Sequence, residues 1–279
     1  MALRIVFSVT LFMTVMVVKF VLSAENDLDI SSAIDGSNFD GQKTGSNWFQ
    51  AAIFRSTLGA NILSCGGTLL TDRWIVTGAS CLWRSRIEDL TIRLGEFDLE
   101  NEEEPLKAEE YKVEKIEINP EYEEIEFRND IALLKLDRIV KFDKHIIPVC
   151  LPSEDLSLVN RTATVTGWGF INEDSRNFRT TVLRQVDVEV FSNERCNEWF
   201  SEVGLNRLIS ESELCAGRVE GGKDACTGDS GGPLTTLING RKILIGIVTW
   251  GKGCGRRHSP GVYAKINHFV PWIKNVMKN

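Results

Sequence analysis

The chain has 279 residues, of which 43% are hydrophobic and 25% are charged. These are the proportions of a globular protein with a sizeable core, long enough for one large domain or two small ones. The formal net charge of −7 argues against nucleic acid as a partner, because phosphate binding needs clustered Lys and Arg.

The first residues have the features of a secretory signal peptide. Arg4 supplies a positive charge, and residues 5–18 form an apolar run too short to cross a bilayer, followed by small residues up to Ala24. We therefore expect residues 1–24 to be a signal peptide and the protein to be secreted, with no membrane partner; a retained anchor is the alternative. Removal of Arg4 and Lys19 takes the net charge from −7 to −9.

The next residues, 25–45, are polar and rich in Asp, Ser and Gly, and we expect a flexible segment there. From residue 46 onward, short segments of β character follow one another between turn residues. The clearest runs, in chain order, are Leu90–Leu94, Ile131–Leu136, Ala163–Thr166, Val186–Val190 and Ile243–Trp250. Only the end predicts a helix, with Phe269 and Ile273 on its apolar face and Pro271 in its first turn. The pattern predicts an all-β domain over residues 46–279, closed by a C-terminal helix.

Three short motifs carry the chemistry. Gly228–Pro233 (GDSGGP) sets a serine among glycines, where the backbone can approach a substrate carbonyl closely. Asn129–Leu134 (NDIALL) places one acid at the start of an apolar strand, and Trp74–Cys81 (WIVTGASC) is an apolar strand that runs into a cysteine. Together, in this order and spacing, the three motifs are highly specific.

On these motifs the chain resembles the trypsin/chymotrypsin (S1) family of serine proteases, over residues 46–279. Further matches are Cys65–Leu69, Val149–Pro152, Gly167–Gly169 and Pro260–Tyr263. The resemblance implies two packed six-stranded antiparallel β-barrels with the active site between them. It also implies that Ser230 is the nucleophile, Asp130 the buried acid, and the amides of Gly228 and Ser230 the oxyanion hole.

The general base of this family is a histidine, which precedes the cysteine in Thr-Ala-Ala-His-Cys. Here residues 77–81 read TGASC, so that Ser80 stands at the histidine position. A hydroxyl does not accept a proton near neutral pH, and loss of the base typically costs on the order of 10⁶ in rate. The three histidines, His145, His258 and His268, fall elsewhere, and none is an obvious substitute. Ser80 therefore predicts a non-catalytic homologue.

A second departure lies near the start of the domain. Active relatives are cut after Arg or Lys, and the new N-terminal Ile-Val-Gly-Gly pairs with an acid that Asp229 matches. Residues 33–37 here read AIDGS, with no basic residue before Ile34, and Lys43 is too close to the first strand. Without that ammonium group, we expect the oxyanion hole and the pocket to stay zymogen-like unless other contacts order them.

The specificity pocket, in contrast, matches the trypsin type. Asp224 matches the acid at its base, Gly251 and Gly261 its open walls, and Thr249 and Trp250 the segment that pairs with substrate backbone. A buried carboxylate favours Arg or Lys side chains through charge-assisted hydrogen bonds. The alternative is that these residues persist only as scaffold.

Seven cysteines in a secreted chain imply disulfides with one cysteine left over. By the resemblance the pairs, each worth roughly 2–4 kcal/mol, are Cys65–Cys81, Cys196–Cys215 and Cys226–Cys254. Cys150 remains, since the chain has no cysteine before Cys65. It is expected to be either a buried thiol or the disulfide partner of a second chain.

Two further sites concern sugar and calcium. Asn160-Arg161-Thr162 is a glycosylation sequon on an expected surface connection, and it is either occupied or unused. The acid-rich stretch after Gly95 resembles the calcium-binding loop of the family. Its candidate ligands are Glu96 and Glu103 with Glu109 or Glu110. A solvated acidic loop without calcium is the alternative, and no other cofactor is expected.

These features favour a secreted, catalytically inactive serine protease homologue. It would bind proteases, their substrates or their inhibitors as a regulator in an extracellular protease cascade, of the arthropod defence or venom type that the resemblance suggests. The competing class is an active trypsin-like endopeptidase that cleaves after Arg or Lys, which Ser230, Asp130 and Asp224 favour and Ser80 opposes. A purely structural component is a third class, which the residues do not distinguish from the first.

Overall fold

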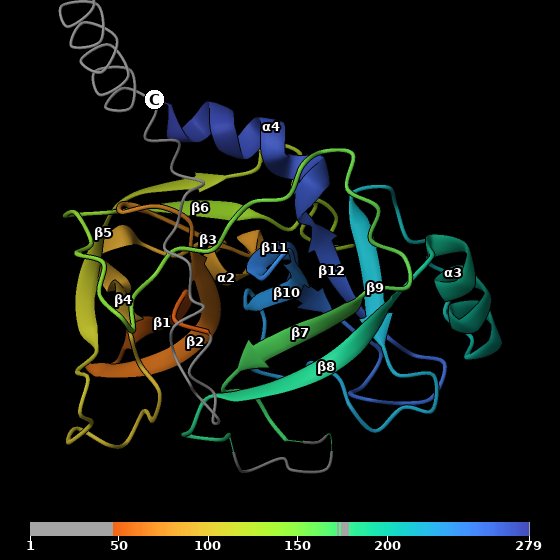
Figure 1. Ribbon diagram of the computed structural model, residues 1–279, viewed down its shortest axis with the longest axis horizontal. Coiled ribbons are helices and arrows are strands. Elements are labelled where there is room, and N and C mark those ends of the chain that lie inside the picture. The colour runs from red at the N-terminus through yellow and green to blue at the C-terminus, as the bar shows by residue number, and fades with distance from the viewer. Residues whose placement is uncertain (1–46, 172, 174–178, 279) are drawn as a thin grey trace, which may run out of the picture. The chain divides into compact units, whose positions relative to one another are not determined.

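The protein folds into two closed antiparallel β-barrels of six strands each. The computed structural model describes residues 47–171, 173 and 179–278, so the expected signal peptide and N-terminal segment lie outside the described residues. In Figure 1 the first barrel is orange to yellow-green and the second is green to blue. The expected fold class is confirmed.

The first barrel runs in the order β1-β2-β3-β6-β5-β4. Its strands are β1 (Gln50–Thr57), β2 (Ala60–Leu69), β3 (Trp74–Thr77), β4 (Leu90–Leu94), β5 (Glu109–Ile118) and β6 (Ala132–Leu136). It closes where β1 pairs with β4, with Ile53 opposite Ile92. Both side chains are fully buried, because β-branched apolar residues pack well on the inner face of a sheet.

The second barrel runs in the order β10-β11-β12-β9-β8-β7. Its strands are β7 (Thr162–Gly167), β8 (Arg184–Phe191), β9 (Glu213–Gly217), β10 (Pro233–Ile238), β11 (Arg241–Trp250) and β12 (Gly261–Lys265). It closes where Leu234 of β10 lies opposite Val165 of β7. The strand-like runs of the sequence all fall within β4, β6, β7, β8 and β11, apart from Ile131, which directly precedes β6.

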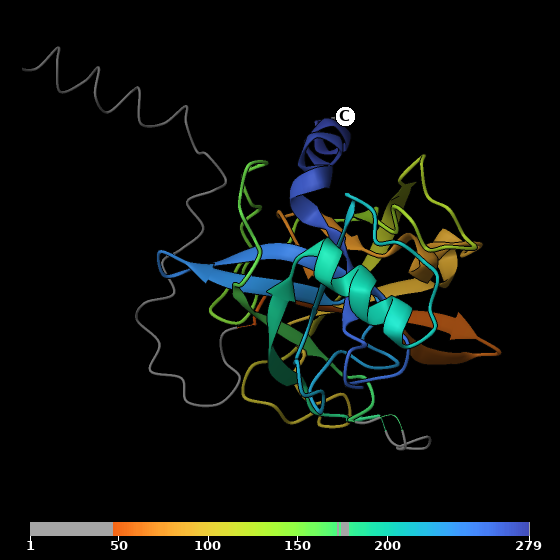
Figure 2. The same ribbon diagram turned by 90° about the vertical axis from the view of Figure 1, so that its right-hand side faces the viewer.

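Four short helical segments accompany the barrels: α2 (Ala79–Leu82), the 3-10 turn η2 (Ile87–Asp89), α3 (Asn193–Glu202) and α4 (Ile266–Met277). The hydroxyl of Ser192 caps α3 by accepting from Arg195 N, and α3 stands on the outside of the second barrel (Figure 2). None of these described helices is long and apolar enough to cross a bilayer.

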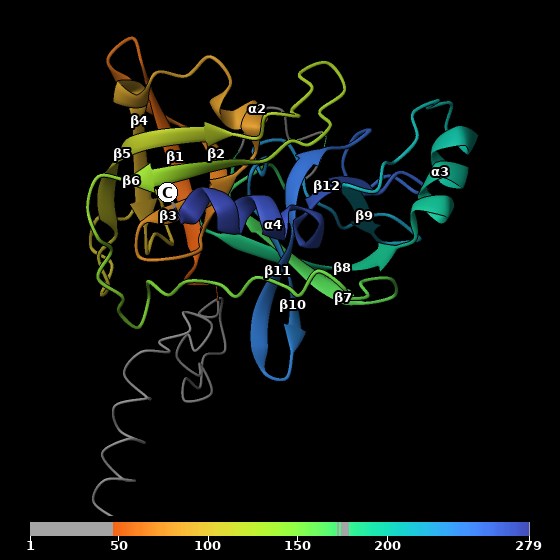
Figure 3. The ribbon, with the colours of Figure 1, turned by 90° about the horizontal axis from the view of Figure 1, so that it is seen from above.

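The predicted C-terminal helix is α4, which lies across the barrels in Figure 3. Phe269 and Ile273 are buried in the main core cluster, with Trp272 and Val276 packed against it. The expected position of Pro271 was wrong, because the helix begins at Ile266 and the proline therefore lies inside it. The apolar stripe still holds the helix on the core, despite the hydrogen bond that an internal proline removes.

The two barrels meet at the turn that contains Ser230. The N–H of Gly66 in β2 donates to the carbonyl of Ser230 at 2.9 Å. A Cβ at Gly66 would lie 2.8 Å from the Cα of Gly232, so only glycine allows this close approach. The motifs around Cys65 and Ser230 are thus brought together at the junction.

Candidate functional site

Ser230 lies in a tight turn that precedes β10. Gly228 and Gly231 have φ values of +99° and +77°, which favour glycine. The N–H of Asp229 closes the turn by donating to the carbonyl of Cys226 at 3.0 Å. Within the described ranges, the N–H groups of Gly228 and Ser230 have no acceptor, which leaves both for a ligand.

The carboxylate of Asp229 holds this turn against the end of β7. Its oxygens accept hydrogen bonds from the N–H groups of Gly169 at 2.8 Å and Cys226 at 2.9 Å. Burial raises the pKa of Asp229, while these two bonds and the charge of Arg179 lower it. The turn is therefore ordered by backbone donors, and the expected N-terminal contact at Ile34 lies outside the described residues.

Ser80 in α2 makes two hydrogen bonds to Asp130. Its N–H donates to Oδ1 at 2.7 Å, and its hydroxyl donates to Oδ2 at 2.8 Å. Asp130 is only 1% exposed, so the two bonds replace hydrogen bonds that water would otherwise donate to its carboxylate. The hydroxyl of Ser80 thus acts as a donor to the acid and presents no basic atom to Ser230.

The ionisation of Asp130 is unfavourable in this environment. Burial raises the pKa of its carboxyl to about 6 from an ordinary 3.8, although the bonds from Ser80 lower it in part. No cation is paired with Asp130 among the described residues.

A cavity of about 310 Å³ opens beside Ser230. The residues predicted for the pocket and the oxyanion hole all line it: Asp224, Gly228, Ser230, Thr249, Trp250, Gly251 and Gly261. A Cβ at Gly261 would lie 2.8 Å from Oδ1 of Asp224, so a larger residue there would close the cavity onto its acid.

Asp224 is one of two acids that line the cavity, and the other, Glu173, accepts from Arg256 at 2.7 Å. Oδ1 of Asp224 accepts the N–H of Ala225 at 2.8 Å, and its Oδ2 accepts the N–H of Gly255 at 3.1 Å. Burial outweighs these bonds and raises the pKa of Asp224 to about 7. A bound cation would favour the ionised carboxylate, so the cavity is suited to a basic side chain.

The three histidines of the chain lie in other parts of the fold. His145 is buried, with Nε2 3.0 Å from the carbonyl of Lys107. His258 contacts Glu202 through Nδ1 at 2.8 Å, and His268 is exposed on α4. None of the three lines the cavity beside the nucleophile.

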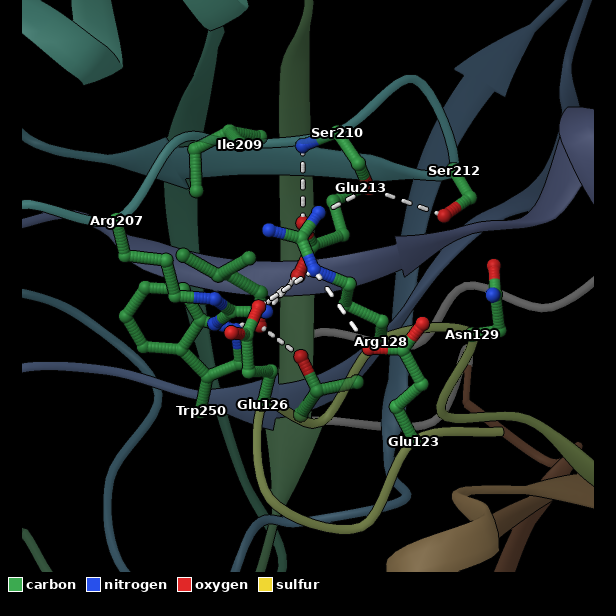
Figure 4. Close-up of polar contacts among 12 residues, drawn as sticks. Glu123, Glu126, Arg128, Asn129, Arg207, Ile209, Ser210, Ser212, Glu213 and Trp250 are labelled. Carbon is green, nitrogen blue, oxygen red and sulfur yellow. Dashed lines mark hydrogen bonds and ion pairs between the residues drawn. The ribbon is translucent and has the colours of Figure 1, made fainter. Parts of the chain in front are cut away.

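A polar network around Trp250 was not foreseen from the sequence (Figure 4). Oε1 of the buried Glu213 accepts from Arg207 at 2.7 Å and from the indole N–H of Trp250 at 3.2 Å. The guanidinium of Arg207 also lies over the indole ring, 4.1 Å from its centroid. The network fixes one wall of the cavity, and only an isolated acid two residues before Cys215 marks it in the sequence.

Three disulfides join Cys65 to Cys81, Cys196 to Cys215 and Cys226 to Cys254, as the resemblance implies. Cys150 is the free cysteine of the described part of the chain, where its thiol is half-buried. Burial raises the pKa of this thiol, which disfavours the reactive thiolate. A disulfide to a second chain stays a prediction.

Asn160 is exposed in a turn with φ +63°. Its N–H donates to the carbonyl of Val190 at 2.8 Å, so the backbone is held while the side chain faces solvent. This position suits glycosylation, which stays a prediction.

The proposed calcium ligands do not fit an ion. Arg93 donates to Glu96 at 2.9 Å and to Glu110 at 2.8 Å, so a guanidinium already lies between two of the four candidates. A third, Glu109, accepts from the hydroxyl of Tyr111 at 2.5 Å. Glu103 is exposed and its N–H bonds to Asn101. Within the described ranges, no three metal-ligating side chains gather. None of the roles proposed below for these residues therefore involves calcium.

Comparison with known proteins agrees with this geometry. A family model described as Trypsin matches residues 38–273. The chain belongs to the trypsin family. It is 40% identical over 210 residues to "Serine proteinase stubble" of Drosophila melanogaster and 39% identical over 228 residues to "Testisin" of Homo sapiens.

A third relative is "Vitamin K-dependent protein C" of Rattus norvegicus, 35% identical over 238 residues. The three alignments cover 75%, 76% and 83% of this trypsin-family chain, in the order given. They cover 26% of the Drosophila protein, 70% of Testisin and 49% of protein C. The chain therefore spans about a quarter of the first relative and about half of protein C.

The raised pKa of Asp130 makes a prediction for stability. The pKa of this carboxyl rises from 3.8 to about 6 on folding. Its protonation therefore stabilises the folded protein below pH 3.8, and this stabilisation is lost as the pH rises through about 6. We expect Asp130→Asn, which can still accept from Ser80 N, to raise the unfolding free energy at alkaline pH by up to about 3 kcal/mol. Near pH 4 the difference should vanish.

Chemical denaturation at both pH values measures this effect. Asp155→Asn, at an exposed acid, is the control and should change little. A variant that is equally stable or less stable than the natural protein at alkaline pH contradicts the assignment.

The position of Arg93 makes a second prediction. Arg93→Gln would leave Glu96, whose side chain is 6% exposed, without its cation, and we expect a loss of about 1–3 kcal/mol. Arg86→Gln, which breaks a pair with 74% and 71% exposed side chains, should cost less than about 0.5 kcal/mol. Thermal unfolding of the natural protein should be the same with calcium or a chelator, and a calcium-dependent midpoint would show that the ion does bind.

Proposed function

We propose that this chain is a secreted, catalytically inactive serine protease homologue that regulates an extracellular protease cascade by binding. The observation that carries this is the hydrogen bond from the Ser80 hydroxyl to Asp130, at 2.8 Å. In the family, a histidine at this position takes the proton of the nucleophile. Here the group at that position is a donor to the acid, so Ser230 has no base.

Binding is supported by the cavity that remains. Asp224 offers a carboxylate, and Gly228 and Ser230 offer N–H groups, around a cavity of about 310 Å³. A ligand residue whose basic side chain fills the cavity, and whose carbonyl oxygen accepts from the two N–H groups, would use the carboxylate and both N–H groups. The proposed partners are therefore proteases, substrates or inhibitors that present an exposed Arg or Lys.

A second candidate is an active endopeptidase that cleaves after Arg or Lys. It is favoured by the ordered turn at Ser230, where Asp229 is held by Gly169 and Cys226. It requires a base from outside the chain or from an arrangement of side chains other than the one observed.

An assay on peptides containing Arg or Lys distinguishes the two. We expect the natural protein to turn over no faster than Ser230→Ala. Ser80→His should raise turnover by several orders of magnitude, because it returns an imidazole between Asp130 and Ser230. Ser80→Ala, which also lacks a base, is the matched control and should remain silent.

If the natural protein cleaves the peptides and Ser230→Ala does not, the proposal of an inactive homologue is overturned and the endopeptidase is favoured. Silence of Ser80→His would show that a second defect, such as the missing activation step, blocks catalysis independently. Ligand binding by the silent protein is a separate readout, and its absence would contradict the binding role.

A further inference from the structure

We propose that Arg179 forms a carboxylate-binding subsite against Gly228, so that the cleft recognises a basic side chain followed directly by a carboxylate. This rests on the proposed function, because it names the ligand class of the same cleft. The complementary pair is Asp224, which lines the cavity, and Arg179, which does not line it and lies against Gly228.

Arg179 is held in place by both barrels. Its backbone forms an antiparallel bridge with Phe170, whose N–H donates to the carbonyl of Thr227 at 2.9 Å. Its Nη1 donates to the carbonyl of Leu63 in β2. The side chain thus connects the first barrel to the turn that precedes Gly228.

The guanidinium lies directly against Gly228. A Cβ at Gly228 would be 3.2 Å from Nε and 3.4 Å from Nη2 of Arg179. Gly228 also lines the cavity, whereas Arg179 does not. The cation is therefore adjacent to the residue whose N–H faces a ligand, but outside the space that a basic side chain would fill.

Among the residues that the structure describes, no acid forms an ion pair with Arg179. Its side chain is exposed. The charge of Arg179 lowers the pKa of Asp229, which is buried and already accepts from two N–H groups. Nε and Nη2 therefore keep N–H donors for an external carboxylate, which a guanidinium binds in a planar fork.

These positions specify the chemistry of the ligand. When the basic side chain of a ligand residue contacts Asp224, the carbonyl carbon of that ligand residue lies at the N–H groups of Gly228 and Ser230. A negative group next in the chain is then on the side of Arg179. Two sources supply such a group: the terminal carboxylate of a chain that ends in Arg or Lys, or an Asp or Glu side chain that follows Arg or Lys. The first is the product of an endopeptidase that cuts after basic residues.

Calorimetric titration with four peptides tests the subsite on the intact secreted protein, at low salt and mildly alkaline pH. Acetyl-Gly-Gly-Arg is used with a free carboxylate and as its amide. Acetyl-Gly-Gly-Arg-Asp-Gly-amide is compared with the peptide that has Asn for Asp. Mass spectrometry confirms that the peptides stay intact. The free-acid pair and the Asp/Asn pair separate the two sources.

We expect the charged member of at least one pair to bind roughly threefold to tenfold more tightly than its neutral partner, as a partly exposed ion pair allows. In Arg179→Gln the ratio should fall to about one, while the affinity for the neutral peptides is unchanged. Arg179→Lys keeps the charge and should retain part of the ratio, and Arg86→Gln should retain all of it.

No preference in the natural protein, or a preference that survives in Arg179→Gln, overturns the subsite. If the neutral peptides bind to the natural protein and not to Asp224→Asn, the proposed function stands although the subsite fails. If none of the four peptides binds, both are overturned. A loss of neutral-peptide binding in Arg179→Gln would assign the residue a structural role and also overturn the subsite.

Discussion

The buried carboxylate of Asp229 is the group on which the ligand-facing turn depends. Its two hydrogen bonds from Gly169 and Cys226 tie the end of the β7 segment to the turn before β10. They offset part of the desolvation cost of a buried charge. A Cβ at residue 167 would lie 2.0 Å from this carboxylate, so glycine is a condition of the arrangement. Gly228 and Ser230, the neighbours of Asp229 in this turn, are positioned by this contact.

The Ser80–Asp130 pair and the acid of the cavity belong to different barrels. Ser80 and Asp130 belong to the first barrel, at α2 and just before β6, whereas Asp224 lies between β9 and β10 of the second. Ser80 donates two hydrogen bonds to Asp130 and does not line the cavity. The proposed loss of the base at residue 80 is therefore compatible with a cavity and N–H donors that remain in place.

The parts of this picture that the sequence predicted are those carried by short motifs. Ser80 and Asp224 each stand at a recognisable offset from a cysteine, and Asp130 stands at the start of an apolar strand, so their surroundings could be expected. Arg179 and Glu213 could not, because their contacts are made between loops and strands far apart in the chain: Arg179 is 116 residues from Leu63. The calcium ligands did not fit for a different reason. The acid-rich sequence does not show that Arg93 of β4 donates to Glu96, three residues later, and to Glu110 on the paired strand β5.

The proposal that an inactive homologue still binds a basic ligand in its cavity can be tested most directly with benzamidine, a small aromatic cation, titrated from about pH 5 to about pH 9. The cation binds the ionised carboxylate of Asp224, whose pKa is about 7. The dissociation constant should therefore be constant above that pH, and should rise about tenfold for each pH unit below it. Asp224→Asn should abolish the binding. Absence of binding at every pH, or equal affinity in Asp224→Asn, would contradict a preserved basic-specific cavity.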